Sequence, residues 1–311
     1  MELAPFFADV ADGPVGGVAY WRHADDGVRL RLTHWPNADA KGTVLIFTGR
    51  TEFAEKYGRA ARELLAAGYT VLAIDWRGQG MSDRLHDDHG LGHVGRFSDY
   101  YRDADAMVAA ARDLDLPRPH YLLGHSLGGG IGLGALMRGL DVRAVFFSAP
   151  MFGINAHPVR RGMVMGLSAL AGALGQSARV VPGLSTAITI AQTPFAINEL
   201  THDPDQYAFL QEQVNAHPEL ALGAPSLHWI REAVKETDRL NRKPSPDVPT
   251  LTMVGTEETI VDPRRIQNRM RRWPNGRLEV VPGGRHEMLV ELPEIRARVV
   301  SAMLAHFAAH P

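Results

Sequence analysis

The sequence of 311 residues contains no cysteine. Disulfide bonds, thiolate metal sites, iron–sulfur clusters and a cysteine nucleophile are therefore excluded. It also has little excess charge of either sign, because 33 Lys and Arg residues stand against 35 Asp and Glu residues. A formal net charge of −2 gives no general attraction for nucleic acid, so we expect no nucleic-acid partner.

Long hydrophobic runs are absent as well. The longest segment of low charge, residues 162–178, is interrupted by glycine and serine and is shorter than a membrane span. The first thirteen residues contain acidic residues but no Lys or Arg, which is unlike a secretory signal. We therefore expect no transmembrane helix and a cytoplasmic location.

The remaining composition is that of a globular protein, with 45% hydrophobic and 22% charged residues. In the first half, short apolar runs alternate with helical patterns. Strands are predicted over 43–48, 70–75, 120–124 and 143–148, and helices over 52–67, 97–114 and 126–138. This alternation is typical of βαβ units, in which helices cover both faces of a mostly parallel sheet. Residues 17–21 and 28–35 predict an antiparallel hairpin before these units.

The alternation stops at Pro150 and resumes near Val248. The residues between them are helical in pattern, punctuated by proline and glycine, and contain no run typical of a buried strand. Strands over 250–255 and 277–281 then follow, with helices over 263–272 and 293–309. The sequence thus predicts a core made of residues 1–150 and 248–311, interrupted by a helical lid over 151–247.

The strongest local motif is Gly124-His125-Ser126-Leu127-Gly128, which lies between a predicted strand and a predicted helix. The pattern G-x-S-x-G at such a turn is typical of a nucleophile elbow, in which a side chain at 124 or 128 would collide with the elbow's backbone. The alternative is a glycine-rich turn that holds an ordinary serine. The flanking strand and helix favour Ser126 as a catalytic nucleophile.

A serine hydroxyl needs a general base, and the base needs an orienting acid. In α/β hydrolases both follow the serine, in the order acid and then histidine. His286 follows the strand over 277–281 and the loop Pro282-Gly283-Gly284-Arg285, so we predict it as the base. The other downstream histidines are interpreted as surface or lid residues, namely His157, His202, His217, His228, His306 and His310.

The acid is expected in the loop after the strand over 250–255. Glu258 lies on this loop, where its carboxylate can face an imidazole, and it is our first choice. Asp262 is the alternative acid, although an aspartate directly before Pro263 is also typical of a helix N-cap. Glu257 should point away from the site.

An oxyanion hole requires two backbone N–H groups, one of them from the residue after the nucleophile. Leu127 supplies the first in this prediction. The second should come from Arg50, in the loop Phe47-Thr48-Gly49-Arg50-Thr51, where Gly49 allows a close turn; a plain turn is the alternative.

Two other polar groups are interpreted as structural. Residues 75–82 (DWRGQGMS) are expected to form a loop that Asp75 and Arg77 hold in place. A cluster of potential oxygen and nitrogen ligands, formed by Asp83, His86, Asp87, Asp88, His89 and His93, matches no zinc or calcium spacing. We expect it to be a hydrated loop, and we predict neither a metal nor a cofactor.

Taken together, these motifs resemble the α/β-hydrolase fold, and within it the lysophospholipase and monoacylglycerol lipase group, also described as serine aminopeptidase-like hydrolases. The resemblance covers nearly the whole chain. It rests on GRTEFAEKY (49–57), DWRGQGMSDR (75–84), GHVGRFSDYYRD (92–103), GHSLGG (124–129), GTEETIVD (255–262) and GGRHEML (283–289). The resemblance implies a catalytic triad of Ser126, Glu258 and His286, a monoacyl lipid ester as substrate, and a lid that forms an acyl tunnel.

The segment Gly162–Leu174, which follows Arg160 and Arg161, is rich in methionine and leucine. Such a helix can form the wall of an acyl pocket or make transient contact with the inner-membrane surface. The alternative is a helix packed on the core with solvated arginines.

Two other functions stay open. A small-residue aminopeptidase or a general carboxylesterase would use the same triad. A peptidase would also need carboxylates to bind a substrate ammonium, for which Glu52, Glu55 and Glu199 are candidates. A catalytically silent binding protein is the non-enzymatic alternative.

Overall fold

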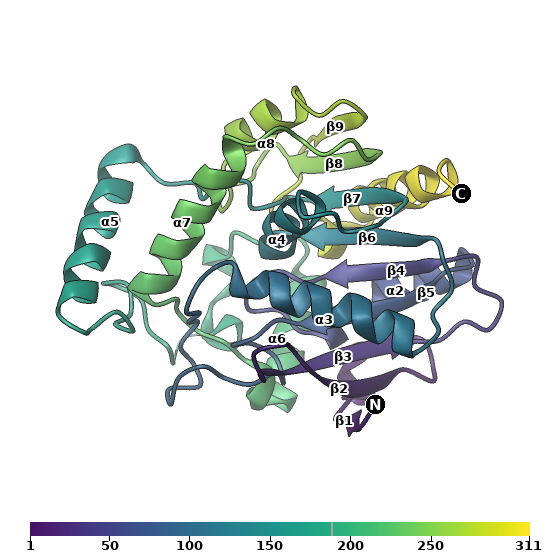
Figure 1. Ribbon diagram of the computed structural model, residues 1–311, viewed down its shortest axis with the longest axis horizontal. Helices are drawn as coiled ribbons and strands as arrows, with labels where there is room; N and C mark the ends of the chain where they lie inside the picture. The colour runs from purple at the N-terminus through teal and green to yellow at the C-terminus, as the bar shows by residue number, and fades with distance from the viewer. Residues whose placement is uncertain (188) are drawn as a thin grey trace.

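The computed structural model describes residues 1–187 and 189–311, apart from the side chains of Pro158 and Arg160. A single sheet of nine strands forms the centre of the part described, in the order β1-β2-β3-β5-β4-β6-β7-β8-β9 (Figure 1). The strands are β1 (Leu3–Ala4), β2 (Val18–His23), β3 (Arg29–Trp35), β4 (Thr43–Phe47), β5 (Thr70–Asp75), β6 (His120–His125), β7 (Ala144–Ser148), β8 (Thr250–Gly255) and β9 (Gly276–Val281). β1, β2 and β3 pair antiparallel, β3 pairs antiparallel with β5, and β4 to β9 are parallel.

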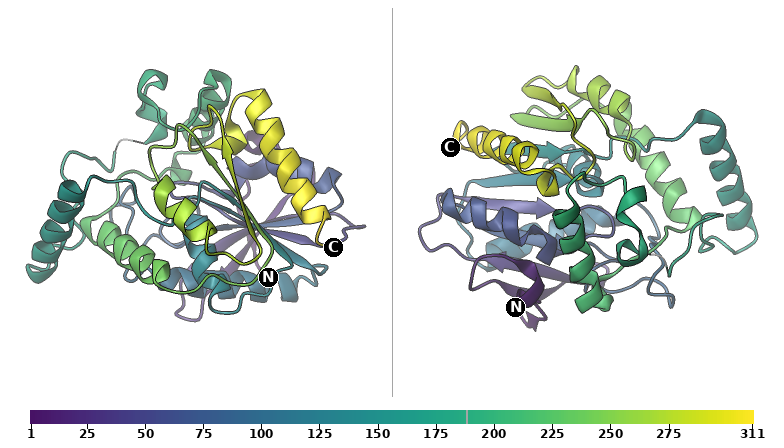
Figure 2. Two further views of the ribbon diagram at one scale, coloured as in Figure 1. Left: turned by 90° about the horizontal axis from the view of Figure 1, so that it is seen from above. Right: turned by 180° about the vertical axis from the view of Figure 1, so that it is seen from behind.

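Helices cover both faces of this sheet (Figure 2). α3 (Asp99–Asp113) and α4 (Leu127–Leu136) lie on one face, and α2 (Gly58–Ala66) and α9 (Pro293–Ala308) lie on the other. The remaining helices and short 3₁₀ turns are α1 (Ala8–Ala11), η1 (Ala54–Tyr57), α5 (Pro158–Ala173), η2 (Ile190–Gln192), η3 (Phe195–Ile197), α6 (Pro204–Ala216), η4 (Pro218–Leu220), α7 (Leu227–Asn241), α8 (Pro263–Met270) and η5 (Met288–Val290). This is the α/β architecture that the sequence predicts.

The parallel strands are buried on both sides. Every residue of β4, β5, β6, β7 and β8 is buried, as expected for continuous apolar runs in a sheet covered by helices. Phe47, Phe146 and Phe147 are among the largest side chains in this core. Burial of apolar surface contributes roughly 25 cal/mol per Å² to the stability of the fold. The packed sheet is therefore a firm support for the loops at its carboxyl edge.

The predicted strands agree closely with the observed ones, whereas one predicted helix starts later than expected. The prediction begins at residue 52, but regular α-helix begins at Gly58, after the 3₁₀ turn η1. The side chain of Glu52 accepts the N–H of Gly49, and Thr51 has a φ of 66°, so residues 49–53 form a turn instead. β1 and α1 were not predicted, because each is too short to carry a periodic pattern.

The segment between β7 and β8 contains α5, α6 and α7. The arrowheads of β4, β6 and β7 point toward α7, so the segment lies at the carboxyl edge of the sheet (Figure 1). α5 packs against α7 at the outer margin of the molecule, whereas α6 contacts α1 and η1. No helix in the described ranges has both the length and the apolar character needed to cross a bilayer.

Asp75, at the end of β5, has the structural role expected for it. Its carboxylate accepts the N–H groups of Ala54 and Met81 and pairs with Arg31, which also binds Glu55. All three charged side chains are fully buried. Asp75 therefore fixes the turn and, because it is buried, is not available to substrate. Removing one partner of such a buried cluster costs about 3–5 kcal/mol of stability.

Candidate active site

Ser126 lies at a sharp turn between β6 and α4. Its φ of 48° is in the left-handed region that non-glycine residues rarely adopt, as expected for a nucleophile elbow. A Cβ at Gly128 would lie 2.0 Å from the carbonyl oxygen of Phe47, and one at Gly124 would lie 3.0 Å from the ring of Phe147. At Gly128 glycine is required by the close approach of the end of β4. At Gly124 it is required by the ring of Phe147 on β7 and, as predicted, by the elbow's own backbone, since the Cβ would also lie 3.1 Å from Gly129 Cα.

The structure brings Ser126, His286 and Glu258 into one hydrogen-bonded chain. His286 Nδ1 lies 2.6 Å from Glu258 Oε2, and His286 Nε2 lies 2.9 Å from Ser126 Oγ. Because a carboxylate only accepts, Nδ1 carries a proton, and Nε2 is the nitrogen that faces the serine hydroxyl. All three residues are buried. A histidine with a proton on Nδ1 and with Nε2 facing the hydroxyl is the tautomer that a general base acting on Ser126 requires.

Glu258 is held in place by its own loop. One oxygen accepts the N–H groups of Ile260 and Val261, at 2.6 and 3.0 Å, and the other is left for His286. Burial alone would raise the pKa of Glu258, but the bonds to the imidazole and to these N–H groups lower it below its ordinary value. The carboxyl is therefore ionised at neutral pH and can stabilise an imidazolium.

The alternative acid has a different role. Asp262 accepts the N–H groups of Arg264 and Arg265 and thus caps the N-terminus of α8. Glu257 is exposed and pairs with His202 at 3.0 Å, away from His286, as expected.

The two backbone N–H groups predicted for an oxyanion hole belong to the loop after β4 and to the start of α4. Within the described ranges, neither N–H donates to a protein acceptor, and Leu127 is the first residue of α4. Gln79 Nε2 holds the loop by donating to the carbonyls of Gly49 and Glu52, at 2.7 and 2.9 Å. The Arg50 guanidinium is directed elsewhere, donating to the Gly223 carbonyl at 2.6 Å, so Arg50 can contribute its backbone N–H alone.

The rival histidines lie away from Ser126. His202 contacts Glu291, His217 contacts Asp9, and His228 contacts the carbonyl of Gly95. Residues 83–93 bring no three ligands together. Among the described residues, the one group with metal-binding spacing is His125, His286 and Glu287, and there the ammonium of Lys56 already lies 2.7 Å from the Glu287 carboxylate. A cation would be repelled at that position.

A cavity of about 240 Å³ opens onto Ser126 and His286. One wall is apolar and combines side chains of the core with side chains of the segment between β7 and β8, namely Phe53, Ile190, Leu200, Leu210, Val214 and Ile260. The other wall is polar and includes Glu52, Lys56, His125 and Glu287. The site therefore has an apolar side for a hydrocarbon group and a polar side close to the nucleophile.

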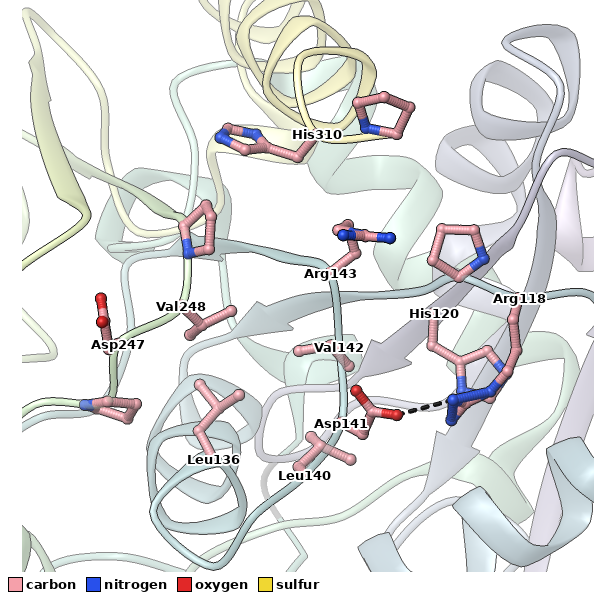
Figure 3. Close-up of a pocket in the computed structure, with 14 residues that line it drawn as sticks. Arg118, His120, Leu136, Leu140, Asp141, Val142, Arg143, Asp247, Val248 and His310 are labelled. Atoms are coloured by element: carbon pink, nitrogen blue, oxygen red, sulfur yellow. Dashed lines mark hydrogen bonds and ion pairs between the residues drawn. The ribbon is translucent and has the colours of Figure 1, made fainter.

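A larger cavity, of about 1020 Å³, lies at the opposite edge of the sheet, where β6 and β7 begin (Figure 3). Its lining includes Arg118 and Asp141, which form an ion pair of 2.7 Å, together with His120 and Val248. No predicted catalytic residue is among its described lining residues. Size alone thus does not identify the active site, because ligands of α/β sheets bind at the carboxyl ends of the strands.

A buried charged cluster beside the nucleophile was not predicted. Lys56 bridges the carboxylates of Glu52 and Glu287, and His125 Nε2 lies 3.2 Å from Glu287. The spacing of Glu52 and Lys56, four residues apart, indicates an ion pair in the sequence. Nothing in the sequence connects either of them to Glu287, which lies at the far end of the chain.

The parallel sheet, the elbow that carries Ser126 and the loops at the carboxyl edge define an α/β hydrolase. The family described as serine aminopeptidase, S33, matches residues 38–293. The chain belongs to this family, within its lysophospholipase and monoacylglycerol lipase group, and is thereby an ester hydrolase.

Three relatives illustrate the relationship. Lysophospholipase L2 of Escherichia coli is 31% identical over 98% of this chain and 93% of its own length. Monoacylglycerol lipase of Mycolicibacterium smegmatis is 34% identical, but over 50% of this chain and 53% of its own length. The solved structure of a soluble variant of monoglyceride lipase from Saccharomyces cerevisiae, in complex with a substrate analog, has a TM-score of 0.72 and 21% identity, covering 93% of this chain and 94% of that one. This last likeness shows the shared fold.

Proposed function

We propose that the protein hydrolyses monoacyl lipid esters, such as a lysophospholipid or a monoacylglycerol, through a triad of Ser126, His286 and Glu258. One observation carries the proposal: the hydrogen-bonded chain of these three side chains ends at a serine that faces a cavity with an apolar wall. The names of the relatives support the same substrate class.

In the proposed mechanism, His286 Nε2 takes the hydroxyl proton as Ser126 Oγ attacks the ester carbonyl. The N–H groups of Arg50 and Leu127 stabilise the oxyanion, and ionised Glu258 stabilises the imidazolium. The proton then passes to the ester oxygen of the alcohol, the bond between this oxygen and the acyl carbon breaks, and the alcohol departs. The acyl group remains bound to Ser126 as an acyl-enzyme. His286 next activates water, and attack on the acyl group releases the fatty acid and the free serine.

Space for an acyl chain supports a lipid substrate. Besides the cavity at Ser126, a second apolar cavity of about 210 Å³ lies between α5 and α7, lined by Val164, Met165, Val181, Leu184, Ile230 and Val234. Ile154 lines this second cavity and pairs by a backbone bridge with Val261, next to Ile260 of the first. We propose that residues 151–247 form a lid and that an acyl chain extends from Ser126 beneath it.

The aminopeptidase alternative is less well supported, because its candidate carboxylates already have partners. Glu52 is paired with Lys56, and Glu55 is fully buried against Arg31. Glu199 accepts from Thr259 and does not line the cavity at Ser126. At Glu52 or Glu55, a substrate ammonium would therefore have to displace an existing cation before it could bind.

A hydrolysis panel tests the substrate class. It compares p-nitrophenyl esters of short and long acyl chains, a monoacylglycerol, a lysophosphatidylcholine and an aminoacyl anilide. We expect kcat/KM to rise with acyl length, roughly tenfold or more between the short and long esters, because each methylene buried in an apolar site contributes about 0.8 kcal/mol. Faster turnover of the anilide than of every ester would contradict the lipid proposal and favour the peptidase.

We also propose that the lid makes transient contact with a membrane surface. Apolar side chains on the outer face of α5 and at its C-terminus form a helical stripe, and each is between 45% and 65% exposed. This α5 stripe consists of Val159, Met163, Leu167, Leu170 and Leu174. The opposite face packs inward, where Ser168 donates to the carbonyl of Leu227.

The charge of the same segment matches an anionic lipid surface. Residues 151–198 contain three arginines and no aspartate or glutamate, and one of the three, Arg161, pairs with Asp238 of α7. An apolar helical face flanked by cations is typical of a helix that lies in the headgroup region of a bilayer. Such contact would place the cavity entrance where monoacyl lipids are concentrated.

Substitution of the α5 stripe tests this contact. Leu170→Glu should weaken binding to phosphatidylcholine vesicles that contain phosphatidylglycerol about tenfold or more, because a buried leucine contributes roughly 2 kcal/mol. Turnover of a short soluble ester should stay unchanged. Val15→Glu, at an exposed apolar residue far from α5 in the chain, is the matched control. Equal vesicle binding by Leu170→Glu and wild type would refute contact through the stripe.

A further inference from the structure

The charged cluster beside Ser126 consists of Glu52, Lys56, His125 and Glu287. Lys56 Nζ pairs with both carboxylates, at 2.7 Å from Glu287 Oε1, and its side chain is 9% exposed. Glu52 also accepts from the Tyr57 hydroxyl at 2.5 Å and from the N–H of Gly49. Three catalytic segments therefore meet in this cluster: the oxyanion loop through Glu52, the elbow through His125, and the loop of the base through Glu287.

The contacts of His125 favour its cationic form. Its Nδ1 lies 3.1 Å from the carbonyl oxygen of Ser148, which only accepts, so Nδ1 carries a proton. Its Nε2 lies 3.2 Å from Glu287 and 3.5 Å from Glu52, and a lone pair facing two carboxylates would be repelled. Burial alone would lower the pKa of His125, but the carboxylates of Glu287 and Glu52 raise it above its ordinary value.

The pKa values of Glu287 and Lys56 are set by the same two opposing effects, burial and nearby opposite charges. Burial would raise the pKa of Glu287, yet His125 and Lys56 hold it well below its ordinary range. Burial would lower the pKa of Lys56, yet Glu287 and Glu52 raise it. Two carboxylates, one ammonium and one imidazolium thus leave the cluster with no net charge.

We propose that this neutral cluster is a positioning device that sets the electrostatic potential at His286 and so fixes the pH range in which His286 acts as a base. The proposal rests on the proposed function of Ser126 and His286. The rings of His125 and His286 are 4.9 Å apart, and Glu287 adjoins His286 in the chain. At such separations in a buried site, one unbalanced charge changes a protonation equilibrium measurably.

The other groups around His286 have fixed roles. Glu258 and Ser126 bind its two ring nitrogens, and Arg285 donates to the carbonyls of Asn198 and Thr201. The charged side chains that line the cavity with it are Arg50, Glu52, Lys56, His125 and Glu287. Of these, Lys56 and Glu52 can be neutralised separately without touching the hydrogen bonds of the triad.

The test compares kcat/KM–pH profiles of the full-length protein on a soluble ester. Lys56→Gln leaves an excess negative charge, which favours protonated His286, so the acid limb should move to higher pH. Glu52→Gln leaves an excess positive charge, so the limb should move to lower pH. Each shift should be about 0.5 pH unit or more, and the double variant Lys56→Gln/Glu52→Gln should return toward wild type. Lys235→Gln, which removes an exposed ammonium paired with Glu232, should not shift the limb.

Shifts of opposite sign that cancel in the double variant would support the proposal. A purely structural role of Lys56 and Glu52 would lower turnover, but the direction of the pH shift would not follow the sign of the charge removed. Shifts of the same sign, or none, would overturn the proposal. The ¹⁵N signals of His125 provide a readout independent of turnover, since both ring nitrogens should remain protonated at neutral pH. Reaction of wild-type Ser126 with a fluorophosphonate keeps the outcomes distinct: a labelled serine with unshifted profiles refutes the cluster alone, and an unlabelled serine refutes both proposals.

Discussion

Ser126→Ala is expected to reduce kcat by at least about 10⁴-fold. Without Oγ no acyl-enzyme can form, and the remaining rate would come from the oxyanion N–H groups and substrate binding alone. The fold should be unaffected, because the side-chain hydroxyl bonds only to His286 among the described residues. Steady-state kinetics on a long-chain ester measures the effect.

The control for this variant is Ser98→Ala. Ser98 is exposed at the start of α3, and its side chain makes no capping hydrogen bond. Its kcat should equal that of wild type, and both variants should unfold at the wild-type temperature. Retained turnover by a folded Ser126→Ala protein would eliminate Ser126 as the nucleophile.

Glu258→Gln should lower kcat by about 10³–10⁴-fold. The amide is nearly isosteric, but it cannot stabilise an imidazolium, and if its NH₂ group faces Nδ1 it favours the wrong tautomer of His286. The pKa of Glu258 is below its ordinary value, so wild type keeps this carboxylate throughout the neutral range. Single-turnover kinetics would show the loss in the acylation step.

Asp262→Asn is the matched comparison, because Asp262 is the other carboxylate of the same loop. It caps α8 and makes no contact with His286, so kcat should be close to wild type. Asparagine is itself a good N-cap, and the free energy of unfolding should change by less than about 1 kcal/mol. A large loss in Asp262→Asn with an active Glu258→Gln would reverse the assignment of the acid.

Much of the fold could be predicted because local and global signals agree. The runs that became β4, β5 and β8 are continuously apolar, which is the pattern of strands covered on both faces. The order of serine, acid and histidine along the chain, together with the loops after β8 and β9, pointed to His286 as the base and to Glu258 as the first choice of acid, with Asp262 left as the alternative. The structure then places these side chains within hydrogen-bonding distance of each other.

Other features depend on contacts between distant parts of the chain and leave no local signal. Lys56 and Glu287 meet only because the loop after β4 and the loop after β9 share the carboxyl edge of the sheet. The protonation of His125 follows from that meeting, and the motif Gly124–Gly128 gives no indication of it. The α5 stripe has a helical period, but the sequence alone does not say which face of α5 packs on α7.

Labelling by an alkyl fluorophosphonate, followed by peptide mapping, tests the central claim most directly. The proposed triad predicts one modified residue, Ser126, with labelling abolished in Ser126→Ala and strongly slowed in His286→Ala. Because the probe mimics the tetrahedral intermediate, reaction requires both an activated serine and an oxyanion site. Absence of label on the folded wild-type protein would contradict the account and favour a binding protein that has the hydrolase fold without its chemistry. Label at a different serine would contradict the assignment of Ser126 as the nucleophile.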